Sequence, residues 1–293
     1  MKKLTLLLLA LTLSLVAWAN KTIVYKCNAD YSVKIWDNTT APHSNEEKKN
    51  ESQDKNDKIW HTSECVIYIY KAKGTPTGQG VVILPGGGYR NLNIKGPAAF
   101  GEYLQSIGIT VALVKYRLPN YGHKEVPLED AEAAIKYLRD HAEELNIDPE
   151  KVGVCGSSAG GNLAAYVSNF AKVETKPNFS ILFYPVISGE VGLLHAGTIL
   201  QLLGRNLTPT LLHKYSLENC VDNTSPPTLI LLSDDDTTVH PENSLAYYKA
   251  LKQNGVKASM HIYPSGGHAW IGNKKFKYDK EYKAAVKDWL SKL

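Results

Sequence analysis

Ser158 stands at the centre of the pentapeptide Gly156-Ser157-Ser158-Ala159-Gly160 and is a candidate nucleophile. The apolar residues Val152 to Cys155 precede this pentapeptide, and a helical pattern of small residues runs from Asn162 to Phe170. A G-x-S-x-G sequence exposes its serine when it forms a tight turn between a strand and a helix. A flexible loop of glycine and serine would use the same residue types, so the rest of the chain must supply the partners that such a serine needs.

His268 is the candidate general base, because Gly266-Gly267-His268-Ala269-Trp270 follows a predicted strand, Ala258 to Tyr263. Imidazole is the side chain best matched to proton transfer near neutral pH. The other eight histidines lack a glycine loop at a strand end, and we interpret His43, His141 and His240 among them as surface residues.

A carboxylate able to orient this histidine lies in Ser233-Asp234-Asp235-Asp236-Thr237, after the apolar segment Thr228 to Leu232. Such a carboxylate also stabilises the imidazolium that forms during catalysis. Asp236 is our first choice for this role and Asp235 is the second. Three adjacent aspartates also suit a solvated turn or a calcium loop, although the spaced oxygen ligands and the glutamate of an EF-hand do not follow.

The glycine-rich stretch Pro85-Gly86-Gly87-Gly88-Tyr89 follows another apolar run, Val81 to Leu84. Glycines let backbone N–H groups approach a reacting carbonyl oxygen without a Cβ in the way. Removing one such donor raises the barrier of acyl transfer by about 3 to 4 kcal/mol. We predict an oxyanion hole made by the N–H groups of Gly87, Gly88 and Ala159, although a triple glycine by itself is also a common turn.

The chain order Ser158, Asp236, His268 is the order expected of α/β-hydrolases, and these residues predict a serine hydrolase. We expect His268 to take the proton of Ser158 while the serine attacks an ester carbonyl, and water then to release the acyl-enzyme. This chemistry calls for neither a cofactor nor a metal. The four cysteines form no CxxC and no zinc-binding spacing.

Strands and helices alternate from residue 80 onward, which predicts an α/β fold. Val81 to Leu84 and Ile109 to Val114 are continuous apolar runs, as expected of strands covered on both faces, and Leu128 to Leu145 has helical spacing. We predict the α/β-hydrolase fold, with a mostly parallel central sheet, helices on both faces and antiparallel N-terminal strands. Ligands on such sheets bind at the carboxyl ends of the strands, where each cluster above is expected. Further strands are expected at 31–36, 65–70, 179–184 and 258–263, and helices at 242–253 and 280–293.

The N-terminus has the pattern of a secretory signal peptide over residues 1–19. Two lysines precede an apolar stretch from Leu4 to Val16, and Ala17-Trp18-Ala19 offers a cleavage site before Asn20. The apolar stretch is shorter than the roughly 20 residues that a membrane-spanning helix requires. We therefore expect export to the periplasm or the extracellular space, and a single domain over residues 20–293.

Export would permit disulfides, and Cys27 and Cys65, both in strand-like N-terminal segments, are the candidates for a structural pair. Cys155 precedes the candidate nucleophile at the end of a strand, and we interpret it as a core residue. The charged and polar run from His43 to Lys58 indicates a solvated connection between strands.

The formal net charge of +4, from 33 basic and 29 acidic residues, is nearly balanced. The sequence shows no basic footprint for nucleic acid or for an anionic membrane. We therefore expect a small-molecule or oligosaccharide ester as the binding partner, no nucleic acid partner, and no membrane attachment after the signal peptide is removed. The oligomeric state stays open.

Residues 80–272 resemble exported α/β-hydrolase carboxylesterases related to acetylxylan esterases and feruloyl-esterase-like proteins. The resemblance implies removal of acyl groups, most often acetyl groups, from sugars of plant polysaccharides. Relatives often carry histidine where this chain has Pro85. The resemblance rests on the glycine-rich stretch, the pentapeptide, the aspartate run, Gly267-His268 and the segments 114–118, 127–131, 203–206, 215–216, 226–228 and 241–244.

Two other functions stay open at this point. A serine peptidase of the prolyl-oligopeptidase type shares the catalytic order but usually carries a further N-terminal domain. A non-catalytic binding protein with this fold usually lacks the serine or the histidine. Four aromatic residues near predicted strand ends either stack on sugar rings or belong to the core, namely Tyr89, Tyr116, Tyr184 and Trp270.

Overall fold

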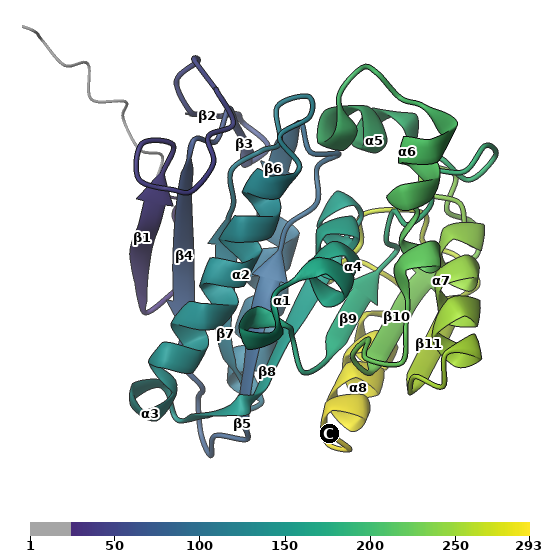
Figure 1. Cartoon of the computed structure of the whole chain (residues 1–293). Coiled ribbons are helices and arrows are strands. Elements are labelled where there is room, and N and C mark those ends of the chain that lie inside the picture. The colour runs from purple at the N-terminus through teal and green to yellow at the C-terminus, as the bar shows by residue number, and fades with distance from the viewer. Residues whose placement is uncertain (1–24) are drawn as a thin grey trace, which may run out of the picture.

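The computed structural model describes residues 25–293, and the predicted signal peptide lies outside these described residues. An eight-stranded sheet runs through the centre of the molecule (Figure 1), in the order β1-β4-β7-β5-β8-β9-β10-β11. Its strands are β1 (Tyr31–Asp37), β4 (Glu64–Tyr70), β5 (Gly78–Leu84), β7 (Thr110–Lys115), β8 (Ile147–Ser157), β9 (Ser180–Phe183), β10 (Thr228–Ser233) and β11 (Ala258–Tyr263).

The strands of this sheet are mostly parallel. β4 is antiparallel to both of its neighbours, β1 and β7, whereas every neighbouring pair from β7 to β11 is parallel. β7 is buried at all six positions, which accounts for its continuous apolar sequence. The predicted mostly parallel sheet with antiparallel N-terminal strands is confirmed.

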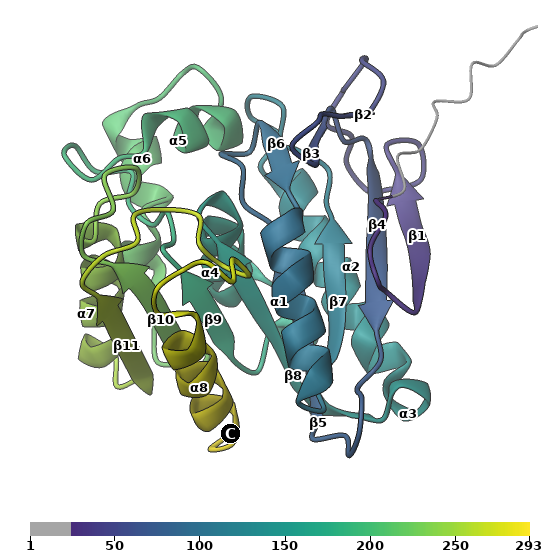
Figure 2. The ribbon, with the colours of Figure 1, turned by 180° about the vertical axis from the view of Figure 1, so that it is seen from behind.

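Helices cover both faces of the sheet, as predicted. In α2, Ala131, Ala134, Ile135 and Leu138 are buried, and their spacing of i, i+3, i+4 and i+7 forms the stripe that packs on the sheet. Figure 1 shows one face with α2 (Glu125–Asp140), α4 (Ala159–Phe170) and α7 (Glu242–Gln253), and Figure 2 shows the other with α1 (Lys95–Ser106) and α8 (Asp279–Leu290).

The helix predicted over Leu128 to Leu145 is divided into α2 and α3 (Ala142–Leu145). His141 separates them, with φ −108° and ψ 22°, outside the helical region. α2 begins at Glu125, three residues before the predicted start. Pro127 lies in its first turn, where the missing N–H has no intrahelical partner to lose.

Two helices between β9 and β10, α5 (Ala196–Leu203) and α6 (Pro209–Lys214), are not predicted by the apolar spacing. They lie beside the carboxyl ends of the parallel strands, at the upper end of the molecule in Figure 1. The Thr208 side chain accepts a hydrogen bond from the Leu211 N–H and so caps α6, with Pro209 at its first position. Threonine followed by proline is a helix-start signal that the sequence does carry. Short 3-10 helices lie at Val173–Thr175 and Leu217–Cys220.

The polar run from His43 to Lys58 is mostly solvated, as its composition indicates, but Asn45 and Glu51 are buried. Asn45 is fully buried and its amide donates to the carbonyls of Thr62 and Leu118 at 2.8 and 2.7 Å. Glu51 forms a buried ion pair with Lys115 at 2.5 Å. These two side chains turn inward because distant groups satisfy their polar atoms. A second, three-stranded sheet pairs β2 (Ser52–Gln53), β3 (Lys58–Trp60) and β6 (Asn91–Asn93).

The candidate disulfide is absent from the described residues, where Cys27 and Cys65 are both free thiols. Cys65 lies near the beginning of β4, whereas Cys27 interacts with Tyr70 at the end of that strand. A strand rises by about 3.3 Å per residue, so the length of β4 keeps the two thiols apart. Cys155 is fully buried, in agreement with its interpretation as a core residue.

A buried ion pair between Arg117 and Asp130 ties the end of β7 to α2. The guanidinium donates to the carboxylate at 2.7 and 3.0 Å, and the Arg117 backbone N–H donates to it at 2.7 Å. Both side chains are fully buried. Trp36 of β1 donates its indole N–H to the same carboxylate at 2.5 Å, so Asp130 connects three elements and satisfies its lone pairs.

Replacing Asp130 by alanine should lower the free energy of unfolding by about 3 kcal/mol, because Arg117 would keep only Glu129, 3.7 Å away, as a counter-charge. Urea unfolding followed by circular dichroism measures this loss. Lys136→Ala is the matched control on the same helix, since Lys136 pairs with Asp140 at an exposed site and its loss should amount to less than about 0.5 kcal/mol. Equal losses in the two variants would contradict the role given to Asp130.

Candidate active site

Ser158 occupies the turn between β8 and α4. Its backbone has φ 56° and ψ −121°, a conformation that residues other than glycine rarely adopt and that the surrounding structure must hold in place. Its N–H donates to the carbonyl of Phe183 in β9, and its carbonyl accepts from the N–H of Asn162 in α4, both at 3.0 Å. The strand, turn and helix expected from the pentapeptide are present, with Ser158 at the tip of the turn.

Gly156 and Gly160 occupy positions where this turn leaves no room for a side chain. A Cβ on Gly156 would lie 2.0 Å from the carbonyl oxygen of Gly160, and a Cβ on Gly160 would lie 2.0 Å from that of Leu84 in β5. Both obstacles are backbone atoms, which cannot rotate away as a side chain can. The glycines on either side of Ser158 therefore follow from the close approach of α4 to β8 and β5.

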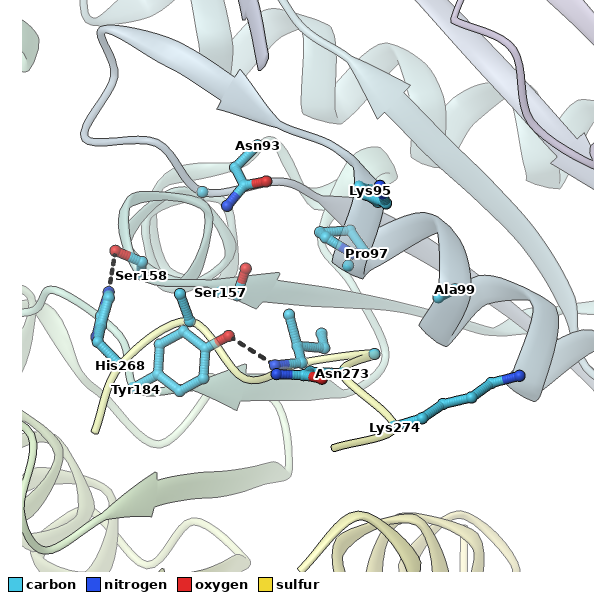
Figure 3. A pocket seen from close by; sticks show the side chains of 15 residues that line it. Asn93, Lys95, Pro97, Ala99, Ser157, Ser158, Tyr184, His268, Asn273 and Lys274 are labelled. Atoms are coloured by element: carbon cyan, nitrogen blue, oxygen red, sulfur yellow. Dashed lines mark hydrogen bonds between the residues drawn. The ribbon is translucent and has the colours of Figure 1, made fainter. Parts of the chain in front are cut away.

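The side chains of Ser158, His268 and Asp236 form one hydrogen-bonded chain. Ser158 Oγ lies 2.8 Å from His268 Nε2 (Figure 3), and His268 Nδ1 lies 2.6 Å from Asp236 Oδ2. When Nδ1 donates to the carboxylate, Nε2 is left to accept the serine proton. The structure thus brings together the three residues that the sequence singles out, in the arrangement that proton transfer from Ser158 requires.

Asp236 is held as a carboxylate although its side chain is only 1% exposed. Its Oδ1 accepts from the N–H groups of Thr238 and Val239 at 2.9 and 3.0 Å. Burial alone would raise the pKa of this carboxyl group, but the hydrogen bond and charge of His268 and the two backbone donors outweigh it, and the pKa lies below its usual value. Asp236 is therefore ionised and can stabilise an imidazolium.

Asp235, the second choice for the acid, has a different set of contacts. Its exposed carboxylate accepts hydrogen bonds from the backbone N–H groups of Gly267 and Gly266 at 2.8 and 3.2 Å. It therefore anchors the loop that carries His268, whereas Asp236 contacts the imidazole itself.

Tyr184 restrains the imidazole from another side. Its ring packs edge-on against that of His268 with 4.6 Å between the centroids. Its hydroxyl accepts from the N–H of Ile271 at 3.1 Å (the second dashed line in Figure 3). Because the ring is fixed at both ends, the imidazole has little freedom to rotate away from Ser158.

The glycine-rich turn after β5 lies directly beside Ser158. A Cβ on Gly86 would lie 3.1 Å from the Cβ of Ser158, and Gly87 and Gly88 follow with φ of 135° and 64°. Ala159 is the first residue of α4, and the N–H groups of a first helical turn have no partner within the helix. The three predicted oxyanion donors thus belong to the two turns that meet at Ser158, and their role stays a prediction.

Tyr116 and Asn93 brace this turn where relatives often have histidine in place of Pro85. The Tyr116 hydroxyl donates to the Pro85 carbonyl at 2.7 Å, and the Asn93 N–H donates to the Gly86 carbonyl at 2.8 Å. Tyr116 is fully buried, so its hydroxyl has no competing water partner. The turn is held from the adjacent strand β7 and from β6.

An open cavity of about 380 Å³ begins at Ser158. Figure 3 shows Ser158, His268 and Tyr184 at one end, with Asn93 and Lys95 across from them. A volume of this size is typical of small-molecule sites. Much of the remaining lining is small, which leaves the serine hydroxyl accessible, and includes Gly86, Gly96, Ala99, Ala269 and Gly272.

The four aromatic residues considered as sugar platforms are core residues. Tyr89, Tyr116, Tyr184 and Trp270 are each exposed by 2% or less. Trp270 stacks on Phe276 with 4.3 Å between ring centroids. None of the four rings offers an open face, and Tyr184 acts on the site through His268.

His195 is a residue near the triad that the sequence pattern does not reveal. It caps α5, where its Nδ1 lies 2.8 Å from Thr198 Oγ1 and 3.3 Å from the Thr198 N–H. Burial lowers the pKa of His195, and the electrostatic effects of His268 and Arg90 lower it further. The pKa shift of His195 thus favours its neutral form.

Within residues 25–293, no group of three or more histidine, cysteine, aspartate or glutamate side chains is placed to hold a metal ion. The helices of the same residues are all too short or too polar to span a membrane.

The family model described as the α/β hydrolase fold matches residues 81–272. The chain belongs to this family, in agreement with the sheet, the helices and the turn at Ser158. A solved structure of an acetyl ester-xyloside bifunctional hydrolase from Caldicellulosiruptor lactoaceticus is similar to it, with 33% identity, a TM-score of 0.69, and coverage of 78% of this chain and 88% of that one.

The names of two curated relatives also describe enzymes that act on xylan or on its esters. An acetylxylan esterase of Xylanibacter ruminicola is 37% identical over 223 residues, which cover 74% of this chain and 46% of the relative. Endo-1,4-beta-xylanase B of Butyrivibrio fibrisolvens is 31% identical over 205 residues, which cover 64% of this chain and 32% of the relative. The chain thus spans less than half the length of each, and the family resemblance expected from the sequence is confirmed.

Asp236→Asn should slow the reaction of Ser158 with a fluorophosphonate reagent and with aryl esters by about 10⁴-fold, because an amide favours the wrong tautomer of the histidine. Asp235→Asn should slow both by less than about tenfold, since its amide oxygen can still accept from the Gly267 N–H and the residue does not contact the imidazole. Labelling rates and initial velocities, taken after melting curves show both variants folded, provide the comparison. A larger loss of rate in Asp235→Asn than in Asp236→Asn would show that Asp236 is not the triad acid.

Proposed function

We propose that the protein is a serine carboxylesterase that removes short acyl groups, in particular acetyl groups, from sugars of plant polysaccharides such as acetylated xylan. The observation that carries this proposal is the hydrogen-bonded chain of Ser158, His268 and Asp236 at the end of an open cavity. A serine activated in this way attacks a carbonyl carbon, and the cavity gives an ester access to it.

Acylation begins when Ser158 Oγ attacks the ester carbonyl and His268 Nε2 takes the serine proton. Asp236 stabilises the imidazolium, and the N–H groups of Gly87, Gly88 and Ala159 are the proposed donors to the oxyanion. The positive end of α4, which begins at Ala159, favours the same negative charge. His268 then donates its proton to the sugar oxygen, the ester C–O bond breaks, and the acyl group stays on Ser158.

Deacylation repeats these steps with water. His268 takes a proton from a water molecule while the water oxygen attacks the carbonyl carbon of the acyl-enzyme. The same N–H groups are the proposed donors to the oxyanion of the tetrahedral intermediate. The proton returns to Ser158 Oγ as the bond between Oγ and the acyl carbon breaks. A carboxylic acid leaves and the free serine is restored, so the cycle needs no cofactor or metal.

The choice of acetylated plant sugars rests on the relatives. The acetylxylan esterase and the acetyl ester-xyloside bifunctional hydrolase are two similar proteins whose names specify acetyl esters of xylan or xylosides. The small residues that line the cavity suit a short acyl chain. Both observations favour an esterase over a peptidase of the prolyl-oligopeptidase type.

Ser158→Ala should reduce the hydrolysis of 4-nitrophenyl acetate and acetylated xylan by about 10⁶-fold, because no other hydroxyl is hydrogen-bonded to His268 among the described residues. Ser157→Ala is the matched control one residue away and should lose less than about tenfold. Released acetate and 4-nitrophenol measure the rates. Full turnover by Ser158→Ala, or a requirement for a metal ion, would refute the mechanism, and faster cleavage of peptide amides than of esters would refute the substrate class.

We also propose that residues 1–19 direct export, to the periplasm or out of the cell. The proposal is supported by the lysine pair, the apolar stretch and the small residues before Asn20. Expression with the native N-terminus should yield mature protein that begins at Asn20, as N-terminal sequencing of the exported fraction would record. Uncleaved protein retained in the cytoplasm would contradict it.

A further inference from the structure

Strained backbone gathers at two places in this molecule. Ten residues other than glycine have positive φ within residues 25–293. Three of them line the cavity at Ser158, namely Ser158, Tyr184 and Ala269. Four others line a second cavity of about 260 Å³, namely His61, Tyr89, Asn120 and Tyr121. Backbone in such conformations persists where surrounding structure enforces it, and it concentrates at binding sites.

Besides the buried Tyr89, two aromatic rings and several polar groups line the second cavity. Trp60 ends β3, and Tyr121 lies in the connection from β7 to α2. Asn120 and His61 add hydrogen-bonding groups beside them. Both β3 and α5 lie at the end of the molecule that carries the carboxyl ends of the parallel strands (Figures 1 and 2). The polar segment before Trp60 thus helps to form a pocket.

Polar contacts fix the two rings in place before any ligand arrives. The Trp60 indole N–H donates to Asp54 Oδ2 at 3.2 Å. The Arg205 guanidinium lies over the Tyr121 ring, 4.9 Å from its centroid, while 44% of Tyr121 stays exposed. A rigid ring loses little entropy when a ligand stacks on it.

The glycine-rich turn separates this cavity from Ser158. Tyr89 lies in its wall and follows Gly88 directly, and its hydroxyl donates to Asn162 Oδ1 at 3.0 Å, four residues beyond Ser158. Arg90 follows Tyr89 and lines the second cavity as well, while Gly86 of the same turn lines the cavity at Ser158. The turn and the residue after it thus contribute to the walls of both cavities.

We propose that the second cavity binds a sugar ring of the oligosaccharide other than the ring that carries the ester. A pyranose has an apolar C–H face that packs on an aromatic ring and a rim of hydroxyl groups that hydrogen-bond to amide, imidazole and carboxylate groups. Trp60 and Tyr121 supply the aromatic surface, and Asn120 and Glu47 supply polar partners. This inference rests on the proposed function, because it concerns the remainder of the same substrate.

The first test compares a long substrate with a short one. Tyr121→Ala and Trp60→Ala should each lower the ratio of kcat/KM for acetylated xylotetraose to that for 4-nitrophenyl acetate by about 3- to 10-fold, mainly through KM. Tyr121→Phe keeps the ring and should keep the ratio. Phe170→Ala is the matched control, since Phe170 is exposed at the far end of α4, and it should leave the ratio unchanged.

The second test needs no turnover. Titration calorimetry of Ser158→Ala with xylotetraose that carries no acetyl group should show binding, and adding Tyr121→Ala should weaken it by about 3- to 10-fold. If no ester is hydrolysed, the proposed function fails while this titration still tests the cavity. If esters are hydrolysed but the ratio and the binding are the same with and without Tyr121, the cavity proposal is overturned and the esterase stands. Tyr121 is exposed, so its loss should leave the fold intact.

Discussion

The close approach of three backbone segments around Ser158 is the constraint on which the site depends. β8 ends, the chain reverses in a single strained residue, and α4 begins against the last carbonyl of β5. Only glycine fits at positions 156 and 160 under this constraint. The strain at Ser158 is held by hydrogen bonds to β9 and α4, which are themselves fixed by the sheet. A hydroxyl placed in this way is exposed and rigid at once.

The other groups of the site come from loops at the same edge of the sheet. His268 follows β11, Asp236 follows β10, and the glycine turn follows β5, so the order of strands determines which loops can meet. Tyr184 and Tyr116 then fix the loops with their hydroxyl groups while their rings remain in the core. The same aromatic residues therefore pack the core with their rings and position the catalytic loops with their hydroxyl groups.

Much of this arrangement could be predicted from the sequence where one local signal sufficed. Apolar runs identified β5, β7, β10 and β11, and the glycine and aspartate clusters after them were found because they punctuate those runs. The polar segment before Trp60 is mostly solvated as predicted, but the burial of Asn45 and Glu51 was missed, because their partners lie far away in the sequence. His195 and the second cavity were not found for a similar reason. They depend on α5, whose position against the glycine turn arises only when the sheet has formed. The division of labour between Asp235 and Asp236 also required coordinates, since neighbouring aspartates give the same local signal.

Those two adjacent carboxylates couple the acid to the loop that it serves. One of them holds the backbone of residues 266 and 267, and the next holds the imidazole of His268. Any displacement of the histidine loop therefore pulls on the same short turn that carries the acid, so the two tend to move as one body. The imidazole and its carboxylate thus keep their mutual position through two separate sets of hydrogen bonds, one to the loop backbone and one to the ring.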